Sequence, residues 1–325
     1  MATPDFFPGA ERAPLTIGLA DVERLEADTH ALRMLDYRQG GGDCLAAVRA
    51  RIGDGRLMLD ASAAEYVQRR LHVAMSDLHN LAGWVCFDIG QTGSARVHFA
   101  QALVLAGRGR HNGLVANISY RLGRVCLHHE RLDEALEYFE LGLLTAAGPG
   151  DEIAAGILST NSAWTHARRG DADQALSELD RGRSHFEAAD HTDVPTWARF
   201  FTETDLSAMT GAIHTDLALT VNPNHTRNAI PLLTEAVDGY GDDMARSRTF
   251  SLILLSINHL IDRELDHGVA IGFRALASAE QLASARVRDR IRPLGIHAKH
   301  HYSHAGAREL AARIAAYAGT PPGQR

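Results

Sequence analysis

Cysteine and long apolar runs are scarce in this chain of 325 residues, and each scarcity excludes a class of protein. The three cysteines, Cys44, Cys86 and Cys126, are odd in number and widely spaced, so they indicate neither a disulfide framework nor a CxxC metal or redox site. No apolar run reaches the roughly 18 residues of a membrane-spanning helix, and no apolar signal-peptide segment follows the N-terminus. We therefore expect a cytoplasmic protein without a membrane partner.

Charge and missing motifs narrow the function further. The formal net charge is −7 and the isoelectric point is near 6.2, so the molecule as a whole lacks the basic surface of a nucleic-acid-binding protein. The sequence contains no glycine-rich nucleotide-binding loop, no GxSxG nucleophile elbow, no HExxH zinc motif and no EF-hand loop. We expect no cofactor and no direct nucleic-acid binding, and binding is favoured over catalysis.

A repeat organises the chain, and its clearest copy lies between residues 78 and 106. Gly83 is followed by a turn, and Ala95, Phe99 and Ala102 then recur at helical spacing. This is the tetratricopeptide pattern, in which a small residue lets two antiparallel helices approach closely and an aromatic side chain fills the groove between them. The position of Ala95 recurs in steps of 40, 40, 54 and 39 residues, at Ala135, Ala175, Ala229 and Gly268.

Five such copies predict a continuous stack, because a single helix pair cannot bury its apolar face alone. We expect an all-α, right-handed α-solenoid of tetratricopeptide-like helix pairs, with N-terminal helices and a C-terminal capping helix. The expected parts are a flexible tail, N-terminal helices packed on the solenoid, the repeats with their cap, and a disordered tail: 1–16, 17–77, 78–318 and 319–325. The long third step places an insertion around 185–203.

Glycine and proline predict where several helices begin and end. The triplet at 40–42 should end a helix over 21–38, and the glycines at 53 and 55 should break a second helix that begins at Cys44. Pro195 should start a helix within the insertion, and Pro293 should stop a basic helix near the C-terminus.

An ordered series of sequence blocks resembles a known family: DVERLEADTHALRMLDYRQGGG, LAGWVCFDIG with ARVHFAQAL, PTWARFFTETDLSAMTG, RSRTFSL and SARVRDRIRPL. Over roughly residues 19–294 these blocks are similar to the C-terminal tetratricopeptide region of actinobacterial XRE-type helix-turn-helix transcriptional regulators. The resemblance implies the sensor and dimerisation half of such a regulator. About 18 residues precede the blocks, so we expect the DNA-binding domain to be missing. The resemblance carries over no ligand.

These features favour a non-enzymatic regulatory or sensor module, active in transcriptional or secondary-metabolism regulation. It would bind a peptide, a small signal molecule or a protein partner in the concave groove lined by the first helix of each pair, and homodimerisation is left open. Six residues are candidates for this groove: His79, Cys86, Tyr120, His166, Arg199 and Asn258.

One alternative is an enzyme or metalloprotein that recruited the scaffold. It would use a row of side chains that lie three residues after the small residue of each first helix: Cys86, Cys126, His166, His214 and His259. Such residue types bind metals or act as bases, but the same row also fits simple packing between helices. Whether metal is bound stays undecided. This also holds for a C-terminal histidine cluster, which is either a chelating set or a solvated face: His297, His300, His301 and His304.

Two further clusters have a structural and a functional interpretation. The aromatic residues Trp197, Phe200 and Phe201 form either a binding platform or the insertion's own core. A basic group either holds an anion or pairs with acidic helix faces: Arg246, Arg248, Arg286, Arg288, Arg290 and Arg292.

Overall fold

The computed structural model describes residues 15–42, 44–146, 148 and 150–319 of the chain. In this part of the chain the regular structure is helical, and the extended pairing consists of an isolated bridge between Thr16 and Ser62. The two predicted tails fall mainly on residues 1–14 and 320–325, which lie outside the described residues. No helix in the described ranges combines the length and the apolar character that crossing a bilayer requires.

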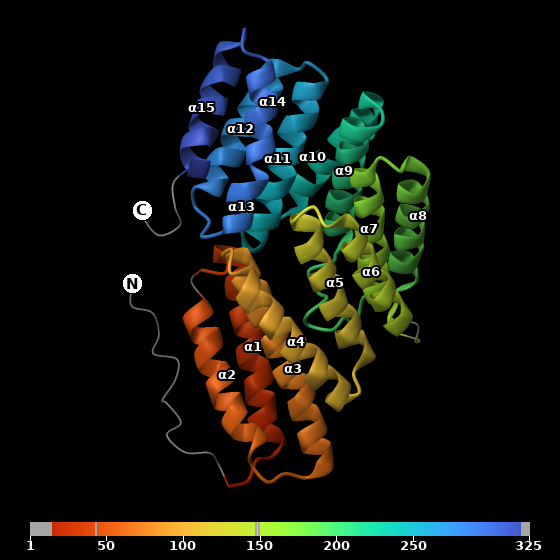
Figure 1. Ribbon diagram of the computed structural model, residues 1–325, viewed down its shortest axis with the longest axis vertical. Coiled ribbons are helices and arrows are strands. Elements are labelled where there is room, and N and C mark those ends of the chain that lie inside the picture. Colours follow the sequence, from red (N-terminus) through yellow and green to blue (C-terminus); the bar gives the residue numbers. More distant parts are fainter. Residues whose placement is uncertain (1–14, 43, 147, 149, 320–325) are drawn as a thin grey trace.

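The helices follow one another with short connections (Figure 1). In chain order they are α1 (Leu19–Gln39), α2 (Leu45–Leu59), α3 (Glu65–Asp88), α4 (Thr92–Gly109), α5 (Asn112–His128), α6 (Leu132–Thr145), α7 (Glu152–Arg169), α8 (Ala172–Ala188), α9 (Glu203–Thr220), η1 (Pro223–His225), α10 (Thr226–Gly239), η2 (Asp242–Met244), α11 (Ala245–Ile261), α12 (Leu265–Ala279), α13 (Ala285–Arg290), α14 (Arg292–His300) and α15 (Ala305–Gly319).

Adjacent helices pack in pairs, which confirms the predicted all-α solenoid. The pairs are α3–α4, α5–α6, α7–α8, α9–α10 and α11–α12, with α14–α15 packed on the last of them as the C-terminal cap and α1 and α2 packed on α3. The first helices also contact one another along the chain, from α3 through α5, α7 and α9 to α11. They therefore form the inner layer, and the second helices form the outer layer.

The small residue of each pair sets how closely the two helices approach. A Cβ atom on Gly83 would lie 2.7 Å from the ring of Phe99, and one on Gly211 would lie 2.6 Å from Leu233. Gly123 faces the ring of Phe139 in the same way. These positions leave no room for a side chain. The recurring small residue in the sequence therefore marks where the two helices of a pair are in close contact.

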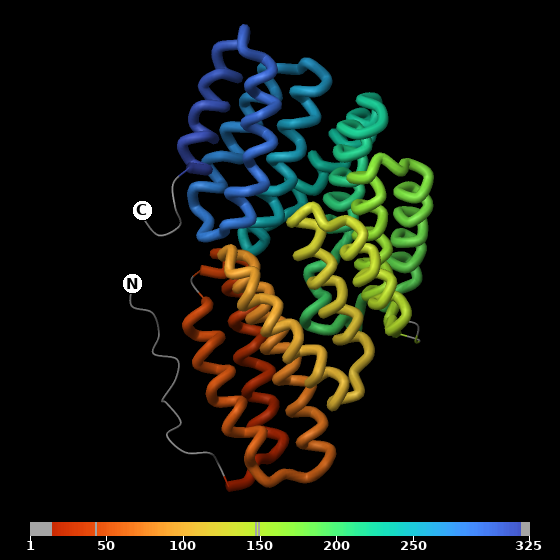
Figure 2. Tube along the Cα trace, viewed as in Figure 1, coloured from red at the N-terminus to blue at the C-terminus, as the bar shows by residue number. Residues whose placement is uncertain are grey.

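The solenoid curls until its two ends meet (Figures 1 and 2). Helix α1 contacts η2 and α11, and α13 contacts α3, although these elements are far apart in the sequence. The sequence repeat gave no indication of this closure, because a period describes only neighbouring pairs.

Two predicted helix boundaries are wrong. Helix α2 continues through both glycines to Leu59. Gly55 serves close packing instead of ending the helix, because it is buried and a Cβ atom there would collide with the Sδ atom of Met75. Residues 196–200 form turns, and α9 begins only at Glu203. The basic helix α13 ends at Arg290, close to Pro293 as predicted, and Pro293 itself lies in the first turn of the next helix, α14, where the missing N–H costs no hydrogen bond.

Candidate ligand-binding site

The inner layer of the solenoid encloses a cavity between the parts of the chain that meet. Its walls come from α1, α3, α5, α7, α9, α11 and α13 and from the insertion before α9. The empty space between the walls, counted out to the mouth, is about 910 Å³, and the centres of water-sized molecules can occupy about 120 Å³ of it. One water needs about 10–15 Å³ by the second measure, so the cavity has room for roughly ten water-sized groups.

The lining residues occupy one face of each inner helix. On α7, for example, Ile157, Asn161 and Trp164 line the cavity at the i, i+4, i+7 spacing of a helix face. In four successive repeats the residue directly after the small residue lines the cavity: Trp84, Arg124, Trp164 and Ala212. The position directly after the small residue therefore indicates a residue of the cavity wall in these four repeats.

Arginine and aromatic side chains dominate the wall. Five arginines line it, whereas Asp205 is the one acidic residue in the lining, as far as the structure describes the chain. Eight of the twenty aromatic residues in the chain also line it: Tyr37, Trp84, Tyr120, Trp164, Phe200, Phe201, Tyr240 and Phe250. Such a wall combines positive charge with flat apolar surfaces.

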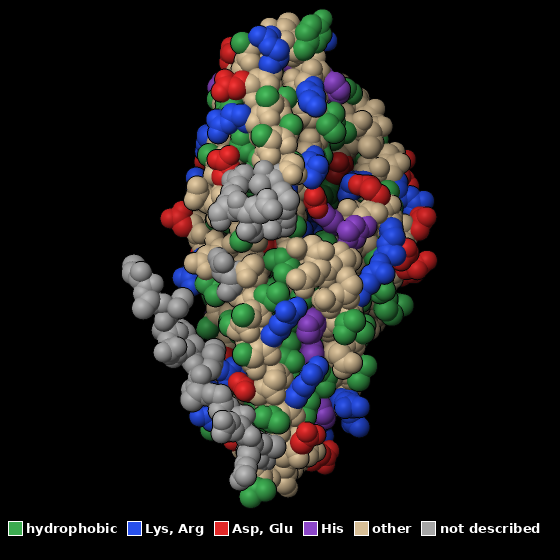
Figure 3. Space-filling view, turned by 60° about the vertical axis from the view of Figure 1, so that its left-hand side comes forward, with side chains coloured by type: hydrophobic (Ala, Val, Ile, Leu, Met, Phe, Trp, Pro, Cys, Tyr) green, Lys and Arg blue, Asp and Glu red, His purple; other side chains and the backbone are tan. Residues whose placement is uncertain are grey.

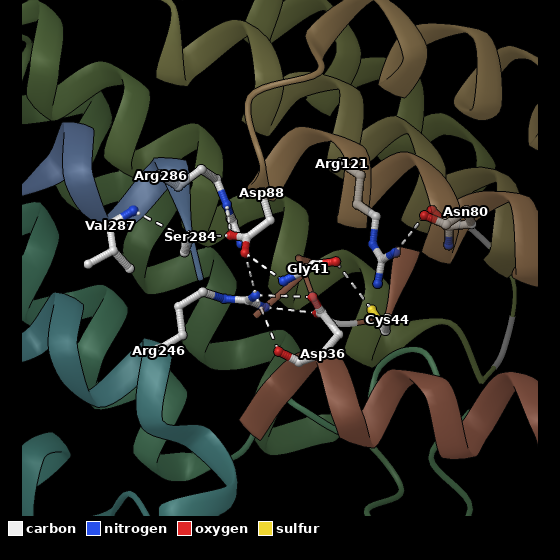
Figure 4. Close-up of polar contacts among 10 residues, drawn as sticks. All are labelled: Asp36, Gly41, Cys44, Asn80, Asp88, Arg121, Arg246, Ser284, Arg286 and Val287. Carbon is white, nitrogen blue, oxygen red and sulfur yellow. Dashed lines mark hydrogen bonds and ion pairs between the residues drawn. The ribbon is translucent and has the colours of Figure 1, made fainter. Parts of the chain in front are cut away.

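Two of the arginines, Arg246 and Arg286, belong to a buried ion-pair cluster that joins the ends of the solenoid (Figure 4). Arg246 donates to both carboxylate oxygens of Asp36, at 3.1 and 2.9 Å, and lies 3.1 Å from Asp88. The Nε atom of Arg286 donates to Asp88 at 2.7 Å, and the hydroxyl of Ser284 donates to the same oxygen at 2.9 Å. We call these five residues the clasp.

Asp88 is the centre of the clasp. It is the last residue of α3 and is fully buried. Burial alone would raise the pKa of its carboxyl, but the charges of Arg246 and Arg286 outweigh burial and lower this pKa to about 2. The backbone N–H of Gly41 donates a further hydrogen bond at 2.9 Å. Asp88 is thus charged, and its partners come from α11, from the segment that begins α13, and from the glycine triplet after α1.

The glycine triplet does more than end α1. A Cβ atom on Gly41 would lie 2.7 Å from the carbonyl oxygen of Val85, so only glycine lets the backbone reach the end of α3 at this point. Gly40 has a φ of +89°, which also favours glycine. The triplet therefore brings the start of the chain into the clasp.

The other three arginines, Arg121, Arg124 and Arg290, form no ion pair with a carboxylate within the described ranges. Arg121 is 2% exposed and donates to the carbonyl oxygen of Asn80 at 2.9 Å, and burial together with the nearby Arg33 lowers its pKa to about 10. Arg124 donates to Asn161 and lies 4.6 Å from the ring centre of Trp164. These groups remain charged at neutral pH.

Arg290 is the least satisfied of the three. Its guanidinium lies 4.8 Å from the ring centre of Trp164 and 4.6 Å from that of Phe250, and it makes no hydrogen bond to any described residue. Burial, and then the charges of Arg124 and Arg286, lower its pKa. A guanidinium has five donors, and here they face the cavity without a protein acceptor.

The outer surface has a different character. On the face shown in Figure 3, basic and acidic side chains are mixed, and hydrophobic side chains occur in small groups between them. The unbalanced arginines thus characterise the cavity wall rather than that face.

Asp205 lies on α9, near its first turn. It accepts a hydrogen bond from the hydroxyl of Tyr240 at 2.9 Å and forms no ion pair with any described arginine. Burial raises the pKa of its carboxyl to about 7, against the opposing effect of the hydrogen bonds from Tyr240 and Thr202. This carboxyl therefore holds a proton to a much higher pH than an ordinary aspartate does.

We expect Asp205→Asn to stabilise the protein more at pH 8 than at pH 4.5. A carboxyl whose pKa is raised in the folded state stabilises the fold fully below its ordinary pKa of 3.8, and this contribution is lost as the pH rises towards 7. The asparagine stays neutral, so its advantage should grow with pH by up to about 4 kcal/mol. Urea unfolding of both proteins at the two pH values measures it, with Asp243→Asn on the exposed turn before α11 as the control. A difference that does not change with pH would contradict the shifted pKa.

Of the six predicted groove residues, Tyr120 lines the cavity and the other five do not. His79 is buried with its Nδ1 atom 3.0 Å from that of His98, and burial lowers the pKa of His79 to about 4. Asn258 is buried and donates to the hydroxyl of Thr215. The remaining three also lie outside the wall: Cys86 is buried, His166 is half-buried and Arg199 is exposed.

The repeat row that contains Cys86 and His166 contacts partners within its own helix pair. Arg131 donates to the Sγ atom of Cys126, and His259 lies 2.6 Å from Glu264, in each case five residues further along the chain. This row is two positions beyond the residues of the cavity wall, and two residues rotate an α-helix by about 200°. The row therefore faces almost the opposite direction, towards the turn into the second helix.

The histidines near the C-terminus do not share one helix. Helix α14 ends at His300, so His300 and His304 are not an i,i+4 pair on a helix, and His304 instead lies 3.1 Å from Asp266. Within the residues described, no three His, Cys, Asp or Glu side chains come together in an arrangement that could hold a metal ion.

The aromatic insertion and the basic stretch each divide between the two interpretations. Trp197 is buried in the core, whereas Phe200 stacks on Tyr120 with ring centres 6.0 Å apart and lines the cavity. Among the arginines, Arg286 pairs with Asp88, and Arg290 faces the cavity.

Comparison of the chain with protein-family models and with curated proteins finds no match.

Proposed function

We propose that this protein is a non-enzymatic sensor module that binds a small molecule in the cavity of its solenoid. The cavity wall carries this proposal: it draws side chains from seven helices and an insertion, and it gathers polar donors and aromatic surfaces in one concave space. Sites of this kind, mostly apolar with a few directed polar groups, are typical of small-molecule binding. The regulatory role is supported by the resemblance of the sequence to the sensor half of XRE-type regulators.

The clasp suggests how binding would be communicated. Arg246 and Arg286 line the cavity and also hold Asp36 and Asp88, so a ligand that contacts these arginines acts on the contact between the two ends of the solenoid. A ligand shifts such an equilibrium only if it binds the closed and the open arrangement with different affinity. Occupancy would then change the curvature of the solenoid, which a protein partner or a second copy of the chain would detect.

Native mass spectrometry of untagged protein from its natural host tests this function. We expect extra mass that is released on denaturation, and we expect Ala208→Trp, which fills the cavity from α9, to lose it. The control Ser184→Trp places the same side chain on the exposed face of the outer helix α8 and should keep the ligand. A bare mass for the wild-type protein would count against a bound ligand and in favour of a protein partner alone.

A further inference from the structure

The unpaired arginines on the cavity wall carry a more specific inference, which rests on the proposed function. The geometry points to a flat organic anion as the ligand: an aromatic ring that bears a carboxylate, with its acid group on Arg290 and Arg124 and its ring against the aromatic wall.

Charge gives the first argument. The guanidinium groups of Arg124 and Arg290 lie 4.6 and 4.8 Å from the ring centre of Trp164, and neither forms an ion pair with a carboxylate in the described part of the chain. After burial, the charge of Arg124 contributes most to lowering the pKa of Arg290. An anion bound at Arg290 would offset this repulsion and accept charge-assisted hydrogen bonds.

Hydrogen-bonding capacity gives the second argument. Arg290 donates to no described residue, and the Nε atom of the buried Arg121 has no acceptor either. A buried donor such as the Arg121 Nε atom is usually satisfied, and a carboxylate accepts two parallel hydrogen bonds from one guanidinium, such as that of Arg290. The clasp arginines Arg246 and Arg286 already have such acceptors, which singles out the Arg124 and Arg290 side of the wall.

The aromatic side chains limit the shape of the ligand. Tyr120 and Phe200 are stacked at an interplanar angle of 18°, and Trp164 and Phe250 flank Arg290. Flat surfaces of this kind favour a planar ring in an offset or edge-to-face arrangement. Room for roughly ten water-sized groups suits a molecule of one or two rings.

The polarity of the opposite wall is consistent with a single acid group. Asp205 and Tyr240 are hydrogen-bonded to each other there, and the raised pKa of Asp205 leaves it partly neutral at pH 7. A second anionic group at that end would meet this carboxyl instead of an arginine. The ligand is therefore expected to be a monoanion with a neutral far end.

Titration of the wild-type protein with a matched set of small probes tests the inference. Because Trp84 and Trp164 line the cavity, binding should change the tryptophan fluorescence, and calorimetry gives the affinity. We expect 2-naphthoate to bind, and we expect its neutral analogue 2-naphthamide, the non-planar cyclohexanecarboxylate and inorganic phosphate each to bind at least about tenfold more weakly. Equal binding of the amide would overturn the anion, and equal binding of cyclohexanecarboxylate or phosphate would overturn the flat ring.

A variant series locates the acid group. Arg290→Gln should weaken the binding of 2-naphthoate at least about tenfold and leave the binding of 2-naphthamide unchanged. The affinity of Arg290→Lys for 2-naphthoate should lie between those of the wild-type protein and Arg290→Gln, because lysine keeps the charge but cannot donate two parallel hydrogen bonds. The control Arg292→Gln changes an arginine of α14 that is half exposed and not part of the wall. Equal affinity of wild-type protein and Arg290→Gln for 2-naphthoate would overturn the role of Arg290.

The inference and the proposed function fail separately. If no acid probe binds at millimolar concentration, the anionic ligand is wrong, and the native mass then reports on the function by itself. A neutral molecule released from the host protein would uphold the sensor and reject the anion. A bare mass together with inert probes would reject both.

Discussion

Replacing Asp88 with alanine is expected to lower the free energy of unfolding by about 3–5 kcal/mol. The substitution leaves Arg246 and Arg286 buried without the carboxylate that both contact, and it also removes the acceptor of the Ser284 hydroxyl and the Gly41 N–H. Urea unfolding at neutral pH measures the loss. Since the pKa of Asp88 lies near 2, its stabilisation is present above the ordinary value of 3.8 and should disappear only as the pH falls through 2.

Two controls separate the clasp from general charge effects. Asp133→Ala removes an ion pair with Arg169 in which the aspartate is 82% exposed, and it should change stability by less than about 1 kcal/mol. The double variant Asp88→Leu/Arg286→Met removes both partners of one buried pair and should recover part of the loss, because less unpaired charge remains. If Asp88→Ala and Asp133→Ala were equally stable, the clasp would not hold the ends of the solenoid together.

Phe139→Ala is the second substitution with a large expected effect, again about 3–5 kcal/mol. The ring of Phe139 is fully buried and fills the space that Gly123 leaves open between α5 and α6. Alanine would leave a cavity between α5 and α6. The two closely packed helices could fill this cavity only by shifting as a pair. Thermal and urea unfolding measure the loss, and the transition should broaden if the neighbouring pairs unfold separately.

The matched control is Leu144→Ala on the same helix. Leu144 is 72% exposed, so its removal should change stability by no more than about 0.5 kcal/mol. A small effect of Phe139→Ala, similar to that of the control, would contradict the claim that the glycine and phenylalanine of each repeat set the packing of its helix pair.

The helix pairs were predictable from the sequence because each pair depends on residues close together in the chain. Gly83 and Phe99 lie 16 residues apart, and their contact recurs with the repeat, as between Gly123 and Phe139. The two wrong boundaries have different causes. Gly55 was interpreted as a helix breaker but allows close packing against Met75, and Pro195 was interpreted as a helix start but is followed by turns.

The closure of the solenoid was not predictable in the same way. Asp88 and Arg286 are separated by 198 residues, and neither stands at a position that the repeat marks. Asp88 is the last residue of α3 and belongs to no motif, and Arg286 was one of several arginines with two interpretations. Only the curvature of the stack, which accumulates over all the helix pairs, brings these residues together.

Two of the predicted groove residues, Cys86 and His166, lie two positions beyond a residue of the cavity wall. The sequence drew attention to the row with Cys86 and His166, since cysteine and histidine are chemically active residues. The wall is formed by the row with Trp84 and Trp164, on nearly the opposite side of the same helices. Tyr120 was predicted and lines the wall, and the positions directly after the small residues would have supplied four more wall residues: Trp84, Arg124, Trp164 and Ala212.

A crystal structure of the protein purified from its natural host would show whether the cavity holds a planar anion. We expect density for a planar molecule inside the cavity, with an acid group within hydrogen-bonding distance of Arg290 and a ring against Trp164 or Phe250. The clasp residues should keep their contacts around it. A cavity that holds only water, or a ligand bound elsewhere on the solenoid, would contradict the account.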